Sequence, residues 1–216
     1  YVNERATATQ QTGFWFVAQA RADMPRDMGI LWFGVDDAAT SCLTPIYCCT
    51  TSVPECFSEA NGSILEYSPT SAFWLFNRVT NFAYMRYDMI SSDIRKVSDK
   101  WENDCLTQVK QIDNLRNVSE KNRRKALTRY SITTAQQLFD RWAKLDRYLI
   151  VKYMDGNVKS EHAGVLEYLD GKSGPAHFVE NGNGRQIPDK IQFPGYNEKW
   201  KRAVAKDNGV ILRVIK

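Results

Sequence analysis

The chain has 216 residues with a formal net charge of +4, and 43% of its residues are hydrophobic and 12% aromatic. This length and composition suffice for a packed core and exclude disorder over most of the chain. No run approaches the roughly 18 consecutive apolar residues of a membrane span, so we predict a soluble chain without a membrane partner.

Two short apolar segments near the start of the chain predict β-strands. Residues 12–21 alternate in the period of a strand, with large apolar groups at both odd and even positions, so we expect this strand to be covered on both faces. Residues 24–27 interrupt the run, and residues 29–35 form a second apolar strand. The short connection predicts an antiparallel pair.

Asp36 and Asp37 close the second strand. They could form an acid/base pair or a metal site, but adjacent strand residues face opposite ways and share a proton or ligand poorly. The pattern therefore favours a turn that ends the strand. Residues 36–68 are rich in Ser, Thr, Pro and Cys and predict an ordered loop that lies over other structure.

Five cysteines raise the questions of metal binding, disulfides and nucleophilic catalysis: they are Cys42, Cys48, Cys49, Cys56 and Cys105. No C-x-x-C occurs, and His162 and His177 are far away in sequence, so we predict no metal and no cofactor. Disulfide formation in an oxidising compartment and burial as small side chains both fit the pattern, and the pairing stays open. No sequence neighbour would activate a thiolate, which argues against a catalytic cysteine within the chain.

The middle of the chain predicts helices. Ser68-Pro69 has the pattern of a helix start, and an apolar stripe at steps of three or four continues to about Arg116. A weaker helical segment spans about residues 119–130, and a third helix opens near Thr133 and ends at Asp155-Gly156. The third helix carries one apolar face, made of Leu138, Trp142, Leu145 and Leu149.

The densest basic run, Lys121–Lys125, lies within the weaker helical segment. Because no aromatic stacking residues or glycine loops accompany it, a solvated helix face is favoured over a nucleic-acid patch. We predict no nucleic-acid partner.

The whole pattern is that of an α+β protein in one domain: a strand pair and covering loop over residues 1–68, a helical segment over 69–155 and a turn-rich tail over 156–216. Within the tail we expect turns at residues 181–184, a short helix near 199–206 and a strand over 210–215.

Five separate blocks, in order along the chain, resemble the C-terminal half of bacterial cysteine dipeptidases: they are residues 5–19, 31–38, 44–48, 71–77 and 148–153. These dipeptidases belong to the N-terminal-nucleophile hydrolase superfamily and are related to penicillin V acylase and bile-salt hydrolase. The resemblance implies an αββα sandwich, of which this chain would form the antiparallel core strands, the long helices and the turn-rich tail.

The resemblance also implies a mechanism, hydrolysis of a dipeptide through a thioester by a cysteine freed at the mature N-terminus. Its α-amino group, with a pKa near 8, would act as the base. This chain begins at Tyr1, so we expect the nucleophile to lie outside it, in a missing N-terminal half that acts as its partner. No catalytic residue is assigned in the chain, and the chain alone is expected to be inactive.

Gln10, Gln11 and Thr12 lie where related acylases enter a core strand near the active site, which implies that they line the substrate pocket. The alternative is that they are ordinary polar residues at a strand edge. Missing strands would leave exposed sheet edges, which favour association into a homo-oligomer. The resemblance further implies export from a bacterial cell to the periplasm or the medium. A competing interpretation is a non-catalytic interaction module that docks a partner through the helix from Ser68 to Arg116.

Overall fold

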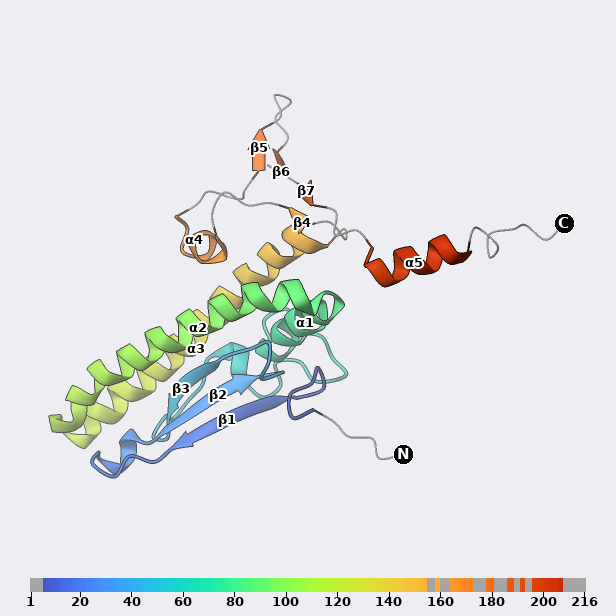
Figure 1. Ribbon diagram of the computed structural model, residues 1–216. Coiled ribbons are helices and arrows are strands. Elements are labelled where there is room, and N and C mark those ends of the chain that lie inside the picture. The colour runs from blue at the N-terminus through green and yellow to red at the C-terminus, as the bar shows by residue number, and fades with distance from the viewer. Residues whose placement is uncertain are drawn as a thin grey trace, which may run out of the picture.

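The computed structural model describes residues 6–154, 158–159, 164–172, 178–180, 186–188, 191–192 and 196–207. The fold is α+β, as predicted, with a three-stranded antiparallel sheet followed by long helices (Figure 1). None of the helices in these ranges is long and apolar enough to cross a membrane.

The sheet has the strand order β1-β2-β3, with β1 at Phe14–Gln19, β2 at Ile30–Val35 and β3 at Leu43–Tyr47. All neighbours are antiparallel, which confirms the predicted pairing of the first two strands. A 3-10 turn, η1 at Arg26–Met28, lies in their connection.

The third strand lies in the segment predicted to be a loop, and that part of the prediction was wrong. Pro45 pairs with Trp32, although proline has no N–H to donate to a strand ladder. An edge strand tolerates this because one of its sides has no partner strand. The outer side of β3 faces a helix, where the Tyr47 N–H donates to the Ser131 hydroxyl at 3.0 Å.

The helical segment contains η2 at Glu55–Phe57, α1 at Ala72–Met85, α2 at Tyr87–Ile112, η3 at Asp113–Asn117 and α3 at Glu120–Tyr153. The predicted continuous helix from Ser68 to Arg116 was therefore wrong. Arg86 has φ −152° and ψ 60°, which ends α1 although neither glycine nor proline is near. The start was also misplaced, because the Ser68 hydroxyl donates to Asn61 and the helix instead begins after Ser71.

The predicted break between residues 130 and 133 is absent, and α3 is a single helix. Ser131 stays helical with its hydroxyl donating to the Leu127 carbonyl at 2.9 Å. The same oxygen accepts from the Tyr47 N–H and, at 3.0 Å, from the Thr50 hydroxyl. Ser131 therefore links α3 to β3.

The tail contains β4 at Val158–Lys159, α4 at Val165–Leu169, β5 at Phe178–Glu180, β6 at Gln186–Pro188, β7 at Ile191–Gln192 and α5 at Glu198–Asp207. Two short antiparallel pairs form, β4 with β7 and β5 with β6. The predicted short helix is confirmed as α5. The predicted helix end at 155–156, turn at 181–184 and strand at 210–215 lie outside the described residues.

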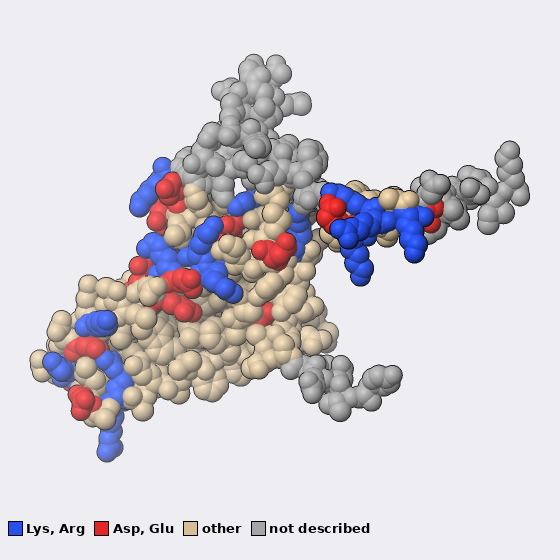
Figure 2. All heavy atoms as spheres, in the orientation of Figure 1, with Lys and Arg blue, Asp and Glu red and all other residues tan. Residues whose placement is uncertain are grey.

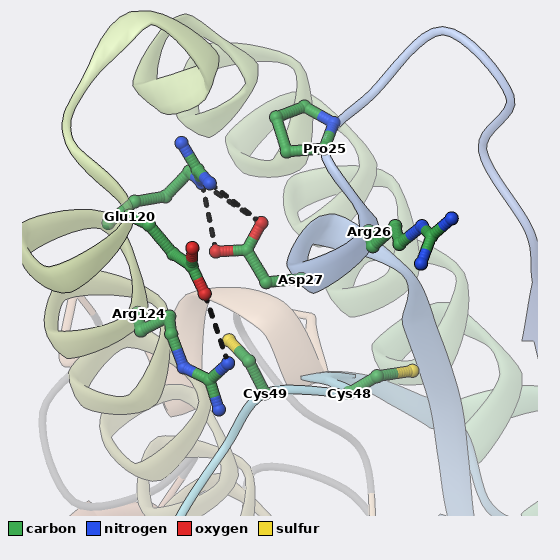
Figure 3. Close-up of a pocket in the computed structure, with 8 residues that line it drawn as sticks. Pro25, Arg26, Asp27, Cys48, Cys49, Glu120 and Arg124 are labelled. Carbon is green, nitrogen blue, oxygen red and sulfur yellow. Dashed lines mark hydrogen bonds and ion pairs between the residues drawn. The ribbon is translucent and has the colours of Figure 1, made fainter.

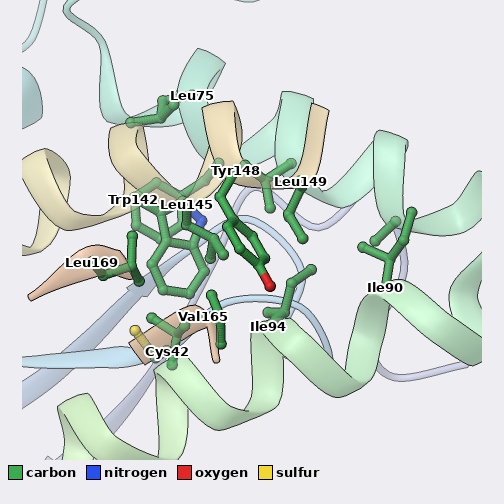
Figure 4. Close-up of a cluster of buried hydrophobic side chains, with 14 of the residues drawn as sticks. Cys42, Leu75, Ile90, Ile94, Trp142, Leu145, Tyr148, Leu149, Val165 and Leu169 are labelled. Carbon is green, nitrogen blue, oxygen red and sulfur yellow. The ribbon is translucent and has the colours of Figure 1, made fainter. Parts of the chain in front are cut away.

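The largest core cluster joins α1, α2 and α3 around Trp142 (Figure 4). The Trp142 ring is fully buried and stacks on Phe76, with the ring centroids 4.7 Å apart and the planes 4° from parallel. The predicted apolar face of the third helix is confirmed, since Leu138, Leu145 and Leu149 are all buried beside it.

The two faces of the sheet differ. On one face, Ile30, Trp32 and Tyr47 pack against α2 and α3 in a second core cluster. On the other face Phe14 and Phe16 are 60% and 55% exposed. The expectation that the first strand is covered on both faces was wrong for this chain, because β1 forms an edge and five of its six residues are exposed. Val17, on the same face as Trp32, is 51% exposed.

Candidate functional site

An apolar groove of about 430 Å³ lies at the end of the sheet where β1 begins and β2 ends. Phe14, Phe33 and Phe57 provide its aromatic side, with ring centroids 6.0 Å apart for the first two and 5.8 Å for the last two. The opposite side is the loop of residues 58–64, and the start of α1 closes the groove. A concave apolar surface of this kind suits a small ligand with an apolar side chain.

Hydrogen bonds to α1 hold the loop in place over the groove. The Trp74 indole N–H lies 3.1 Å from the Ser63 carbonyl and 2.9 Å from that of Glu66. Gly62 has φ +78°, and a Cβ there would meet the Glu66 carbonyl at 2.9 Å, so this turn requires glycine. The shape of the groove thus depends on residues that do not touch a ligand.

The predicted pocket residues Gln10, Gln11 and Thr12 lie beside the groove and not among the residues that line it. They form a turn in which the Thr12 N–H donates to the Thr9 carbonyl at 2.9 Å. Gln10 and Gln11 are exposed, and the Gln10 carbonyl accepts from the Asn77 amide of α1 at 3.4 Å. Gly13 next to them does line the groove. Their role in substrate binding stays a prediction.

Asp36 and Asp37 form the predicted turn at the end of β2, but both are fully buried against α1. The Asp36 carboxylate accepts from the Asp37 N–H at 2.7 Å, and the Asp37 carboxylate accepts from the Tyr84 hydroxyl at 2.8 Å. Burial raises the pKa of Asp36, and burial together with the bond to Asp37 raises the pKa of Tyr84 to about 12.

Asp36 also has φ +66°, a backbone conformation that is uncommon for residues other than glycine. In the sequence, the one feature that marked these residues as a candidate site was a pair of acids directly after an apolar strand. Their burial depends on α1, which lies some forty residues further along the chain.

All five cysteines are free thiols, and only Cys48 is exposed. Burial raises the pKa of Cys56 to about 11 and that of Cys105 to about 12. Burial likewise raises the pKa of Cys42 and Cys49. A thiol needs its thiolate form to attack a carbonyl, so these four side chains are poor nucleophiles at neutral pH.

A second cavity, of about 520 Å³, lies at the other end of β2, where Cys48 and Cys49 meet the start of α3 (Figure 3). Two ion pairs line it, Arg123 with Asp27 at 2.9 Å and Arg124 with Glu120 at 3.4 Å, and Arg26 adds a further positive charge. The two sulfur atoms point in different directions. Arg123, part of the run predicted to be solvated, is buried in this ion pair.

Residues 2–100 match the model of peptidase family C69. The match confirms the resemblance to cysteine dipeptidases and supports a peptidase function. It contains the whole sheet, every residue that lines the groove, α1 and the first half of α2. A comparison with curated proteins finds no matching sequence.

Proposed function

We propose that this chain is the C-terminal part of a dipeptidase whose cysteine nucleophile lies outside it, in an N-terminal partner segment. The observation that carries the proposal is the C69 match, because the matched residues build both the sheet and the apolar groove at its end. The reaction would be hydrolysis of a dipeptide through a thioester on that cysteine.

The open face of the sheet supports this proposal. Phe14 and Phe16 stack with centroids 6.5 Å apart, and their exposed rings lie on the face away from α2 and α3. β1 also leaves one side without a partner strand. Exposed aromatic rings beside an open strand edge are costly in water and favour cover by further strands. A second sheet packed there would complete an αββα sandwich.

The state of the thiols supports a nucleophile supplied from elsewhere. The four buried cysteines have raised pKa values, and none of the bonds described above offers one of them a base. An N-terminal cysteine avoids this difficulty, since its own α-amino group titrates near pH 8.

In this scheme the groove binds an apolar side chain of the dipeptide, and the turn of residues 10–12 lies at its rim. The aromatic wall of Phe14, Phe33 and Phe57 would contact that side chain. We further propose export from a bacterial cell, and a homo-oligomer where the sheet face stays uncovered.

The test is reconstitution with the upstream segment of the same gene. The segment should contain a cysteine at the start of a strand, and co-expression with this chain should yield hydrolysis of simple dipeptides. Substitution of that cysteine with serine should abolish turnover. Dipeptide hydrolysis by the purified 216-residue chain alone would contradict the proposal.

Ile64 and Leu65 provide a matched pair that tests the groove. Both are highly exposed, at 78% and 94%, but only Ile64 lines the groove. Ile64→Glu should raise the KM of the reconstituted enzyme for apolar dipeptides about tenfold, because a charge in the groove must be desolvated when substrate binds. Leu65→Glu should leave the KM within about twofold. Equal effects of the two variants would exclude the groove as the binding site.

The alternative of a docking module has less support. It requires a continuous helix from Ser68 to Arg116, but α1 and α2 are separate helices that contribute buried residues to the core.

A further inference from the structure

Helix α5 presents an exposed apolar stripe. Trp200 and Val204 lie four residues apart in α5 (Glu198–Asp207), and Tyr196 precedes the helix by two residues; their exposures are 45%, 47% and 64%. The rings of Tyr196 and Trp200 stack with centroids 3.9 Å apart. Asn197 begins the helix, since its side-chain oxygen accepts from the Trp200 N–H at 2.8 Å. This hydrogen bond stabilises the first turn of the helix, which contains Trp200.

Basic side chains flank this stripe. Lys199, Lys201, Arg202 and Lys206 lie within α5, against two acids at its ends, Glu198 and Asp207. Figure 2 shows the Lys and Arg side chains gathered along α5, with acidic groups at either end. At 100° per residue, Lys199 and Lys206 border one side of the stripe and Lys201 borders the other, while Asp207 ends the helix on the face of the stripe itself. Lys201 forms an ion pair with Glu198 at 2.8 Å.

We infer that α5 is a membrane-surface helix that binds anionic lipid headgroups. The Trp200 ring and the adjacent Tyr196 ring enter the interface between headgroups and acyl chains, where amphipathic aromatic rings are favoured. The flanking lysines reach outward to the lipid phosphates while their aliphatic stems cover the edges of the stripe. We predicted no membrane partner because no segment is long enough to span a bilayer. We keep that prediction for a membrane span and replace it for binding to the membrane surface.

Charge complementarity selects the lipid surface as the partner. The ten residues of α5 carry four cations and two anions, so the helix is attracted to a negative surface. Every residue from Tyr196 to Lys206 is exposed, so the described part of the chain does not bury the stripe. A short helix with three apolar side chains binds weakly, and we expect its binding to depend strongly on salt.

The inference is tested with the purified 216-residue chain and sedimented vesicles of phosphatidylcholine, with and without phosphatidylglycerol. The chain should bind the anionic vesicles at low salt and be released at high salt, with little binding to the neutral ones. Trp200→Ser should lower the partition coefficient about tenfold, because the main interfacial ring is lost. The double variant Lys199→Gln, Lys206→Gln should lower it to a similar extent.

Two control variants distinguish binding by this site from nonspecific binding through other exposed apolar or basic side chains. Leu65→Ser removes an apolar side chain that is 94% exposed on another loop. The double variant Lys121→Gln, Lys125→Gln removes two exposed cations from α3. Both controls should bind as the parent does. Absence of binding, equal binding to neutral vesicles, or binding unaffected by Trp200→Ser would overturn the inference. Loss of a dimer on Trp200→Ser in analytical ultracentrifugation would also overturn it, because the stripe would then bind a second copy.

Discussion

Replacing Phe76 with alanine tests whether the core around Trp142 holds the helices together. Phe76 is 1% exposed, and its ring lies flat on the fully buried indole at 4.7 Å. Truncation of a buried phenylalanine costs about 3–5 kcal/mol, and the stacked pair accounts for roughly 0.5–1.5 kcal/mol beyond area burial. We expect a loss of about 4 kcal/mol in the free energy of unfolding, measured by urea denaturation with circular dichroism at pH 7.

A loss of this size is comparable to the whole stability of a marginal domain, so a milder variant belongs beside it. Phe76→Leu should cost about 1.5 kcal/mol and keep the chain folded. The control is Phe16→Ala, since this ring is 55% exposed and its removal should cost less than about 1 kcal/mol. Equal losses for Phe76→Ala and Phe16→Ala would refute the assignment of the core to the helices.

Three further predictions concern buried charges and thiols. Arg123→Met leaves Asp27 buried without its cation and should lower the free energy of unfolding in urea by about 3 kcal/mol. A double variant that adds Asp27→Leu should recover part of this loss. No recovery would argue against a buried ion pair. In the folded chain only Cys48 should react quickly with a thiol reagent, whereas all five cysteines should react in denaturant; peptide mapping that finds a second fast site would contradict this. The raised pKa of Asp36 means that the folded state binds its proton more tightly, so its contribution to stability is complete below about pH 4 and is lost as the pH rises through the folded pKa. Asp36→Asn should therefore gain stability relative to the parent between pH 3 and pH 7 in urea titrations, and a constant difference would show that burial does not control this group.

The sequence predicted those elements whose signal is local. Alternation over residues 12–21 and the apolar run over residues 29–35 predicted β1 and β2, and the apolar face around Trp142 predicted the later part of α3. Each of these patterns lies within one segment, so it predicts a strand or helix without knowledge of what packs against it. The motif blocks likewise indicated the family that the C69 match then supported.

The predictions of secondary structure failed where contacts with residues distant in sequence outweighed the local sequence pattern. Pro45 suggested a loop, but an edge strand accepts it. The capping-box pattern at residues 133–137 suggested a helix start, but these residues lie inside α3, which Ser131 links to β3. The break at Arg86 has no glycine or proline to mark it. The groove was also missed, because it combines β1 and β2 with a loop and a helix start that lie up to sixty residues away in sequence.

The sequence by itself therefore determined the α+β class, the first strand pair, the helical core face and the peptidase relationship, because apolar periodicity and motif order are properties of the chain. Only the tertiary structure decided that Asp36 and Asp37 are buried, that four of the five thiols are shielded, and that one face of the sheet lies open. Burial and pKa are set by what packs around a group, and those neighbours come from parts of the chain that no local pattern connects.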